Sequence, residues 1–231
     1  MWNSLRVTLI ACVLALSMVP VAHAVPKSIK LTYEVKRNGK LFGHVTETFT
    51  QNGKQYKLQS TTKGIGVSAL LGERKLLSQG EVTKEGLRPK HFESLQSTSA
   101  KKTLINDFDW KARVLQMQVK GEKRQEALAT GTQDLLSVMY QFMYKPPVAG
   151  PLKLAVTTGK RLKTHQYQVT AQAAPLVTDA GQFKVLELVE TDDADAKKIY
   201  LATEKYALPV KIVVQDDGAT IEQLITQITI E

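Results

Sequence analysis

The fold is decided by the stretch SIKLTYEVKRNGKLFGHVTETFTQNG, residues 28–53. From Ile29 to Val35 apolar side chains alternate with polar ones, which is typical of a strand with one buried face. Asn38-Gly39 then matches a type I′ turn, in which both central residues need positive φ. A second strand is expected from Leu41 to Thr50, and Asn52-Gly53 indicates another turn. The stretch therefore predicts an antiparallel meander.

The same alternation continues along most of the chain. Further strands are expected at residues 56–62, 75–83, 87–96, 102–109, 113–119, 152–157, 162–169, 183–189, 198–202 and 210–214, and in a last strand that carries Leu224, Ile228 and Ile230. An antiparallel sheet of this many strands tends to curl or close, because closure removes exposed edges. We therefore predict a mostly β fold, a single antiparallel meander that forms a strongly curved sheet or open barrel, with one helix packed on a face or mouth.

The predicted helix covers Gln133–Tyr144. Its apolar residues have helical spacing, Thr132 or Asp134 can cap its N-terminus, and Lys145-Pro146-Pro147 ends it. We favour a core role for its apolar stripe. The alternative is a binding site, because methionine adapts to irregular apolar ligands. The residues that would contact such a ligand are Met139, Tyr140 and Met143.

A second departure from the strand pattern is the uncharged, glycine-bounded segment Gly64–Gly72. We favour a loop or short helix that closes one end of the sheet. The alternative is a mobile flap over an apolar cavity, since glycine permits the backbone changes that a flap needs. As a flap, it would present Ile65, Val67, Leu70 and Leu71 to the ligand.

The first 24 residues have the features of a secretory signal peptide. Arg6 is the only charge, an apolar run extends from Val7 to Met18, and Ala22-His23-Ala24 matches a cleavage site. The apolar run is too short to span a bilayer. We predict cleavage after Ala24, a periplasmic location, and a single exported β domain at residues 25–231 without a transmembrane span.

The one cysteine of the chain, Cys12, lies inside this predicted signal peptide. Leu9-Ile10-Ala11-Cys12 looks like a lipid-attachment signal, but the apolar run continues past Cys12 to a good cleavage site. Lipid anchoring at Cys12 is therefore not expected. The mature chain would have no thiol, which excludes disulfides, cysteine nucleophiles and zinc–cysteine sites.

The chain is basic, with a formal net charge of +9. Surplus lysine could steer it toward anionic membrane surfaces or acidic ligands. The basic residues are spread along the chain near predicted turns, where charges keep sheet edges soluble. Nucleic acid is not expected as a partner of an exported protein.

The histidines and acidic clusters do not predict a metal site. His91 and Glu93 share one face of a predicted strand, but the spacing points to no third ligand, and His44 and His165 lie on other strands. The acidic turn 192–195 lacks the glycine of a calcium-binding EF-hand loop, where Lys198 stands instead. We interpret this turn as a solvated hairpin tip.

Catalytic motifs are also missing from the sequence. Ser68 lacks the second glycine of a nucleophile elbow, and no glycine-rich phosphate loop is present. We predict no catalytic residue and no cofactor, and we favour a protein that is not an enzyme. A glycan hydrolase or lyase stays open, because such sites need only a few scattered carboxylates, such as Glu47, Glu93 or Asp107.

Three motifs carry a resemblance to a known family. They are Gly86-Leu87-Arg88-Pro89 followed by Phe92, Gln133-Asp134-Leu135-Leu136-Ser137 with Tyr140 and Phe142, and Leu208-Pro209-Val210-Lys211. In these motifs the chain resembles the exported bacterial proteins of the domain of unknown function 3108 family. That family usually has an aspartate where this chain offers Glu204. The resemblance implies an exported, mostly β domain, and it supplies no activity or catalytic residue to carry over to this chain.

These observations lead to three hypotheses. The first is a non-enzymatic envelope protein that binds an apolar or amphipathic ligand, such as lipid or a lipid-bearing partner, in the concave side of the sheet. The second is the envelope glycan hydrolase or lyase. The third is a structural partner in envelope assembly.

Overall fold

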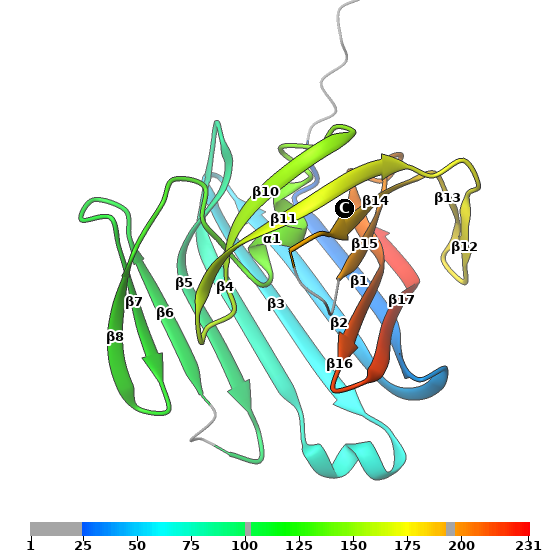
Figure 1. Ribbon diagram of the computed structural model, residues 1–231, viewed down its shortest axis with the longest axis horizontal. Helices are drawn as coiled ribbons and strands as arrows, with labels where there is room; N and C mark the ends of the chain where they lie inside the picture. The colour runs from blue at the N-terminus through cyan, green and yellow to red at the C-terminus, as the bar shows by residue number, and fades with distance from the viewer. Residues whose placement is uncertain (1–24, 100–102, 193–196) are drawn as a thin grey trace, which may run out of the picture.

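A computed structural model describes residues 25–99, 103–192 and 197–231. The predicted signal peptide at residues 1–24 lies outside the described residues. So do residues 193–195, which form most of the acidic turn. Figure 1 shows one large, strongly curved sheet that wraps around a short helix, α1 (Ser137–Gln141).

The described residues form seventeen strands and two short helices. The strands are β1 (Ser28–Arg37), β2 (Lys40–Asn52), β3 (Gln55–Gly64), β4 (Arg74–Thr83), β5 (Gly86–Gln96), β6 (Leu104–Asp109), β7 (Val114–Val119), β8 (Glu122–Ala127), β9 (Gln133–Asp134), β10 (Gly150–Thr157), β11 (Leu162–Ala171), β12 (Leu176–Thr178), β13 (Gly181–Phe183), β14 (Val185–Glu190), β15 (Lys198–Ala202), β16 (Leu208–Asp216) and β17 (Ala219–Ile230). The second helix is the 3₁₀ helix η1 (Gly66–Leu71).

Fifteen of these strands make one sheet in the order β8-β7-β6-β5-β4-β3-β2-β1-β17-β16-β15-β14-β11-β10-β9, and β12 pairs with β13. Neighbouring strands are antiparallel except β9 and β10, which are parallel. The first strand, β1, pairs with the last, β17, in the middle of the sheet. The prediction of a mostly β, strongly curved antiparallel sheet is confirmed, and the sheet is open rather than a closed barrel.

The opening meander forms as its side-chain pattern predicts. Ile29, Leu31, Tyr33 and Val35 are buried in β1, and Asn38 and Gly39 have φ of 49° and 77°, as a type I′ turn needs. The second turn lies one residue later than predicted. Asn52 still pairs with Gln55, so Gly53 and Lys54 make the turn.

The far end of the sheet curls back over β4–β6, and side chains tie it there. Ser78 Oγ donates to Asp134 Oδ2 at 2.6 Å, and Thr157 Oγ1 donates to Asn106 Oδ1 at 2.6 Å. Asn106 Nδ2 also donates to the Gly159 carbonyl at 3.1 Å. These bonds hold the sheet in its curl while its edges stay unpaired with each other.

The predicted helix over Gln133–Tyr144 is too long. Gln133 and Asp134 instead extend the sheet as β9, because they pair with Val156 and Thr157 of β10. Asp134 Oδ1 then accepts from the backbone N–H groups of Leu136 and Ser137, both at 2.9 Å, and so turns the chain into α1. The N-cap itself is Leu136, two residues after the predicted Asp134, and the helix that follows has only five residues.

Candidate functional site

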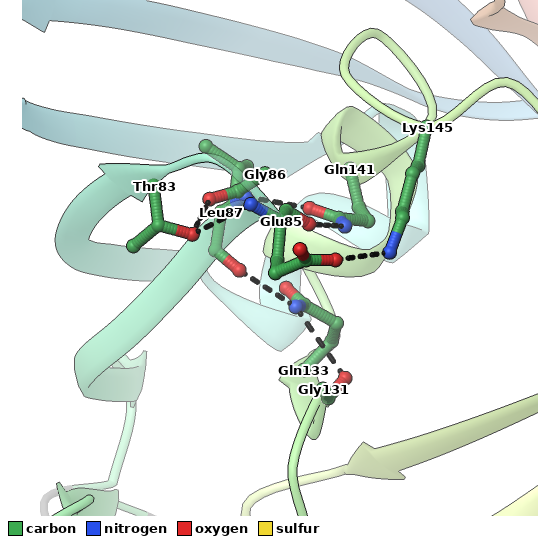
Figure 2. A network of polar contacts seen from close by, with 8 residues as sticks. All are labelled: Thr83, Glu85, Gly86, Leu87, Gly131, Gln133, Gln141 and Lys145. Carbon is green, nitrogen blue, oxygen red and sulfur yellow. Dashed lines mark hydrogen bonds and ion pairs between the residues drawn. The ribbon is translucent and has the colours of Figure 1, made fainter.

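The three motifs that carry the family resemblance meet around α1, although they are far apart in sequence. Figure 2 shows the first contact, between the β4–β5 turn and α1. The Gln141 side chain accepts from the Leu87 N–H at 2.6 Å and donates to the Glu85 carbonyl at 2.8 Å, and Lys145 pairs with Glu85. Gln133 Nε2 donates to the Leu87 carbonyl at 2.9 Å. We call these contacts the α1 junction.

Glu47 of β2 is a buried carboxylate under α1. It accepts a hydrogen bond from the Tyr140 hydroxyl at 3.1 Å, and burial raises its pKa to about 7. The neighbouring Tyr33 hydroxyl donates to the Pro209 carbonyl at 2.9 Å, which brings the third motif to the same place. Glu47 is therefore enclosed by the core rather than open to a substrate.

Asp134, at the start of the α1 segment, is a second buried carboxylate. Burial raises its pKa to about 6, against the opposing effect of its hydrogen bonds from Ser137, Ser78 and Leu136. Ser78 also contacts the Tyr56 hydroxyl at 3.1 Å. Raised pKa values often mark catalytic groups. Here both such carboxylates make hydrogen bonds that connect the α1 segment to the sheet.

The residues in and just after α1 that were considered for ligand contact lie in the core. Tyr140 and Met143 are buried, Met139 packs against the same clusters, and the Tyr140 ring stacks on Phe49 at 5.8 Å between centroids. The favoured interpretation of this stripe as core is confirmed. The stripe fills the concave side of the sheet, where a ligand had been expected.

The segment Gly64–Gly72 contains η1, which connects β3 to β4 at one end of the sheet. This agrees with the favoured interpretation, a loop or short helix. Figure 1 shows this coil (cyan) at the far end of β3 and β4 from α1. No residue of η1 is buried, and Val67, Leu70 and Leu71 are 84 %, 81 % and 59 % exposed. With Ile65 and Leu41, which are also exposed, they form a surface that we call the apolar cap.

The apolar cap is held in one shape by backbone and serine contacts. Ser68 Oγ accepts from the Ile65 N–H at 2.9 Å and donates to the Phe42 carbonyl at 2.5 Å, and the Ile65 N–H also reaches that carbonyl at 3.0 Å. Gly64 has no room for a Cβ, which would lie 2.3 Å from the Ser68 carbonyl oxygen. These contacts hold the backbone of the cap, and four of its residues line a shallow groove of about 530 Å³: Leu41, Ile65, Val67 and Leu71.

The structure does not bring the two predicted ligand-contact sets together. Ile65, Val67, Leu70 and Leu71 lie on the surface at one end of the sheet, whereas the α1 residues lie in the core. The apolar cap therefore does not cover α1 as a flap covers a cavity.

Two of the three carboxylates suggested for a hydrolase, Glu47 and Asp107, do not lie in one site. Glu47 lies in the core, while Asp107 binds His91 at 2.7 Å beside an outer groove of about 440 Å³. In that groove Glu81 pairs with Lys90, and Asp109 accepts from backbone N–H groups of its own turn. The carboxylates with raised pKa and the open groove are thus in different places.

One cluster was missed from the sequence. His165 of β11, Glu190 of β14 and Asp192 place one donor atom each within 4.8 Å of one another, and His165 and Glu190 are buried. Asp192 is only partly exposed and accepts from the Gln166 N–H at 2.9 Å, so this residue is not a solvated tip. His165 and Glu190 come together because β11 pairs with β14 in the structure. Their spacing in the sequence does not show this pairing.

The helices in the described part of the chain, of five and six residues, are too short to cross a membrane.

Comparisons with known proteins identify a family and a similar fold. The family model described as "Protein of unknown function (DUF3108)" matches residues 32–226. A search of curated proteins finds no match. A crystal structure described as a β-barrel-like protein of domain of unknown function DUF1849 from Brucella abortus matches with a TM-score of 0.60 and 11 % identity. The match covers 90 % of this chain and 99 % of that one, so the two share a fold.

Proposed function

This chain belongs to the DUF3108 family of proteins of unknown function, and we propose that it is a non-catalytic envelope protein that docks on an anionic lipid surface through its apolar cap. The observation that carries the proposal is the exposure of the cap. Its side chains are apolar and water-exposed on a rigid support, and contiguous patches of this kind mark interaction surfaces.

The energetic case rests on the transfer of these side chains out of water. Burying a Val or Leu side chain is worth about 1.5–3 kcal/mol when the transfer is complete. Val67 and Leu70 are almost fully exposed, so each can contribute most of this transfer free energy when it enters a lipid surface. Because Ser68 already fixes η1, docking costs little ordering of the backbone.

The charges around the cap suit an anionic surface. Lys40, Lys63 and Lys75 are exposed near the cap, and each cation near such a surface contributes about 1 kcal/mol. Glu73 offsets part of this charge, because it pairs with Lys63 at 2.9 Å and with Lys75 at 3.5 Å. The excess of +9 over the whole chain has the same sign.

The structure favours contact with lipid at the cap over binding of lipid in the concave side of the sheet. The concave side is filled by α1 and the residues that follow it, because Tyr140 of α1 and the nearby Met143 are buried. The lipid of this proposal is therefore a surface that the protein touches from outside. The export signal supports the location: cleavage after Ala24 would deliver the domain to the periplasm without a lipid at Cys12.

The test compares two double variants that remove similar exposed apolar side chains. Val67→Ser with Leu70→Ser alters the cap. The control, Val148→Ser with Val177→Ser, alters two residues that are 82 % and 69 % exposed outside it. Each is sedimented with phosphatidylcholine vesicles with and without phosphatidylglycerol. We expect the wild type and the control to bind the anionic vesicles, and the cap variant to bind at least about tenfold more weakly.

The proposal is wrong if the wild type binds neither kind of vesicle, or if the cap variant binds as tightly as the control. Analytical ultracentrifugation on the same samples distinguishes another occupant. A wild-type dimer that the cap variant alone loses, with no vesicle binding, would identify the cap as an interface between two copies of the chain and would overturn the lipid proposal.

A further inference from the structure

We infer that His165, Glu190 and Asp192 form a binding site for a divalent transition-metal ion such as Zn²⁺. This site is separate from the apolar cap and does not depend on the proposed function. It joins two neighbouring strands, since β11 carries His165 and β14 ends at Glu190. Tyr167, two residues from His165, is the register partner of Glu190. His165 and Glu190 therefore come from the same face of the sheet.

The donor set has the chemistry of a transition-metal site. One imidazole nitrogen and two carboxylate oxygens give three protein ligands, and a water or exogenous ligand can complete a tetrahedron. Imidazole suits Zn²⁺, and carboxylate oxygens also bind it at about 2.0–2.2 Å. Neighbouring donors around a tetrahedral ion at these bond lengths are about 3.3–3.6 Å apart. The donor atoms of this cluster lie within 4.8 Å of one another, so side-chain rotations that draw them together would complete the geometry.

The surroundings place and orient the three ligands. His165 Nδ1 is in hydrogen-bond contact with Glu190 Oε1, so both face the same point. The Lys197 N–H donates to Glu190 Oε2 at 3.3 Å, and the Gln166 N–H donates to Asp192 Oδ1 at 2.9 Å. Such hydrogen bonds to ligating carboxylates are typical supports of metal sites.

The local charge also favours a cation. The cluster holds two carboxylates, Glu190 and Asp192, and Lys163 offsets part of their charge, because its Nζ lies 3.4 Å from Asp192 Oδ2.

The His91–Asp107 pair provides an internal control. It is also a histidine in contact with a carboxylate across two strands, at 2.7 Å, and lies on β5 and β6. Among the described residues, only the His165 cluster brings three donors close together. If one histidine and one carboxylate were enough to bind Zn²⁺, the His91–Asp107 pair and the His165 cluster would bind the ion equally.

The experiment measures Zn²⁺ binding to the full chain after removal of metal with EDTA, by titration calorimetry and by metal content after dialysis. We expect about one Zn²⁺ per chain and a higher midpoint of thermal unfolding with the ion present. Asp192→Asn keeps the acceptor for the Gln166 N–H but loses the charged ligand, and His165→Gln keeps a polar contact to Glu190. Each should weaken binding about tenfold or more, whereas His91→Gln should bind as the wild type does.

The site does not exist if the wild type holds no stoichiometric Zn²⁺, or if Asp192→Asn and His91→Gln bind it equally well. The variant at position 192 carries the test if His165→Gln fails to fold, because Asp192 is partly exposed. Co²⁺ adds a spectroscopic test. Its visible spectrum should change in intensity and position in Asp192→Asn, and an unchanged spectrum contradicts the assignment.

Discussion

The helices α1 and η1 are both short and rich in apolar side chains, yet the fold uses them in opposite ways. In α1, Val138 and Tyr140 are buried, and polar groups from β2 and β4 fix the segment from both ends. In η1 no residue is buried. The difference shows that apolar composition alone does not separate a core helix from a recognition surface. The two kinds of helix are distinguished by their buried polar contacts. Because polar side chains of the sheet bind the α1 segment inside the core, α1 cannot face a ligand.

The first prediction tests the core role of α1 and has the largest expected effect. Tyr140→Ala removes a fully buried ring that stacks on Phe49 and leaves Glu47 without its hydroxyl partner. We expect the free energy of unfolding to fall by about 4 kcal/mol, as for other large core truncations. Urea denaturation measures it. A loss below about 1 kcal/mol would mean that α1 is not part of the core.

The second prediction concerns the buried carboxylate beneath α1. The pKa of Glu47 is raised from 4.5 to about 7 in the folded protein. Between these values the folded state keeps a proton that the unfolded state has lost, so stability falls as pH rises. The loss approaches about 3 kcal/mol and is complete above pH 7.

The matched variant for this pH dependence is Glu47→Gln. It cannot titrate, so its stability should change less between pH 6 and 7, where Asp134, with a pKa of about 6, contributes the smaller part. Urea denaturation at a series of pH values separates the two curves. Parallel curves for the wild type and the variant would show that Glu47 is not a titrating core group.

The third prediction tests the contact between the β4–β5 turn and α1. Gly86 and Gly121 have similar backbone angles, with φ of 95° and 87°, so alanine pays a similar conformational cost at both. A Cβ at Gly86 would lie 2.4 Å from Gln141 Oε1, whereas a Cβ at Gly121 has nothing within 4 Å. We expect Gly86→Ala to cost about 1–2 kcal/mol more than Gly121→Ala, because it displaces Gln141 from Leu87. Equal losses in denaturation would mean that the α1 junction is not a stabilising contact.

The smallest effect on stability is expected at the apolar cap. Val67→Ser with Leu70→Ser removes side chains that contribute little to the core, so each should change the free energy of unfolding by no more than about 0.5 kcal/mol. The same variant is expected to lose vesicle binding. A thermal melt well below that of the wild type would instead place these residues in the core and remove the contrast between η1 and α1.

The general fold could be predicted from the sequence because its signal is local. Alternation in β1 and the Asn38-Gly39 turn specify an antiparallel meander without knowledge of distant residues. Strand β8 was missed, since its residues are exposed and polar and give no alternation. The helix was overextended, because helical spacing does not show that Gln133 and Asp134 pair with β10.

The candidate sites depend on contacts that local patterns do not contain. The sequence marked Val67 and Leu70 as possible contact residues, but their exposure depends on where η1 sits in the fold. His165 and Glu190 are separated by 25 residues and meet only because β11 pairs with β14. The sequence therefore identified the residue types of interest, whereas the pairing of strands decides which of them come together.

The most direct test of the lipid proposal reads the environment of the cap itself. In a Cys12→Ser background, an environment-sensitive fluorophore is attached to Leu70→Cys or, as control, to Val148→Cys, two positions of similar exposure. With anionic vesicles, a blue shift in emission is expected for the label at position 70 and none for the label at position 148. No shift at position 70, or equal shifts at both positions, would contradict docking through the apolar cap.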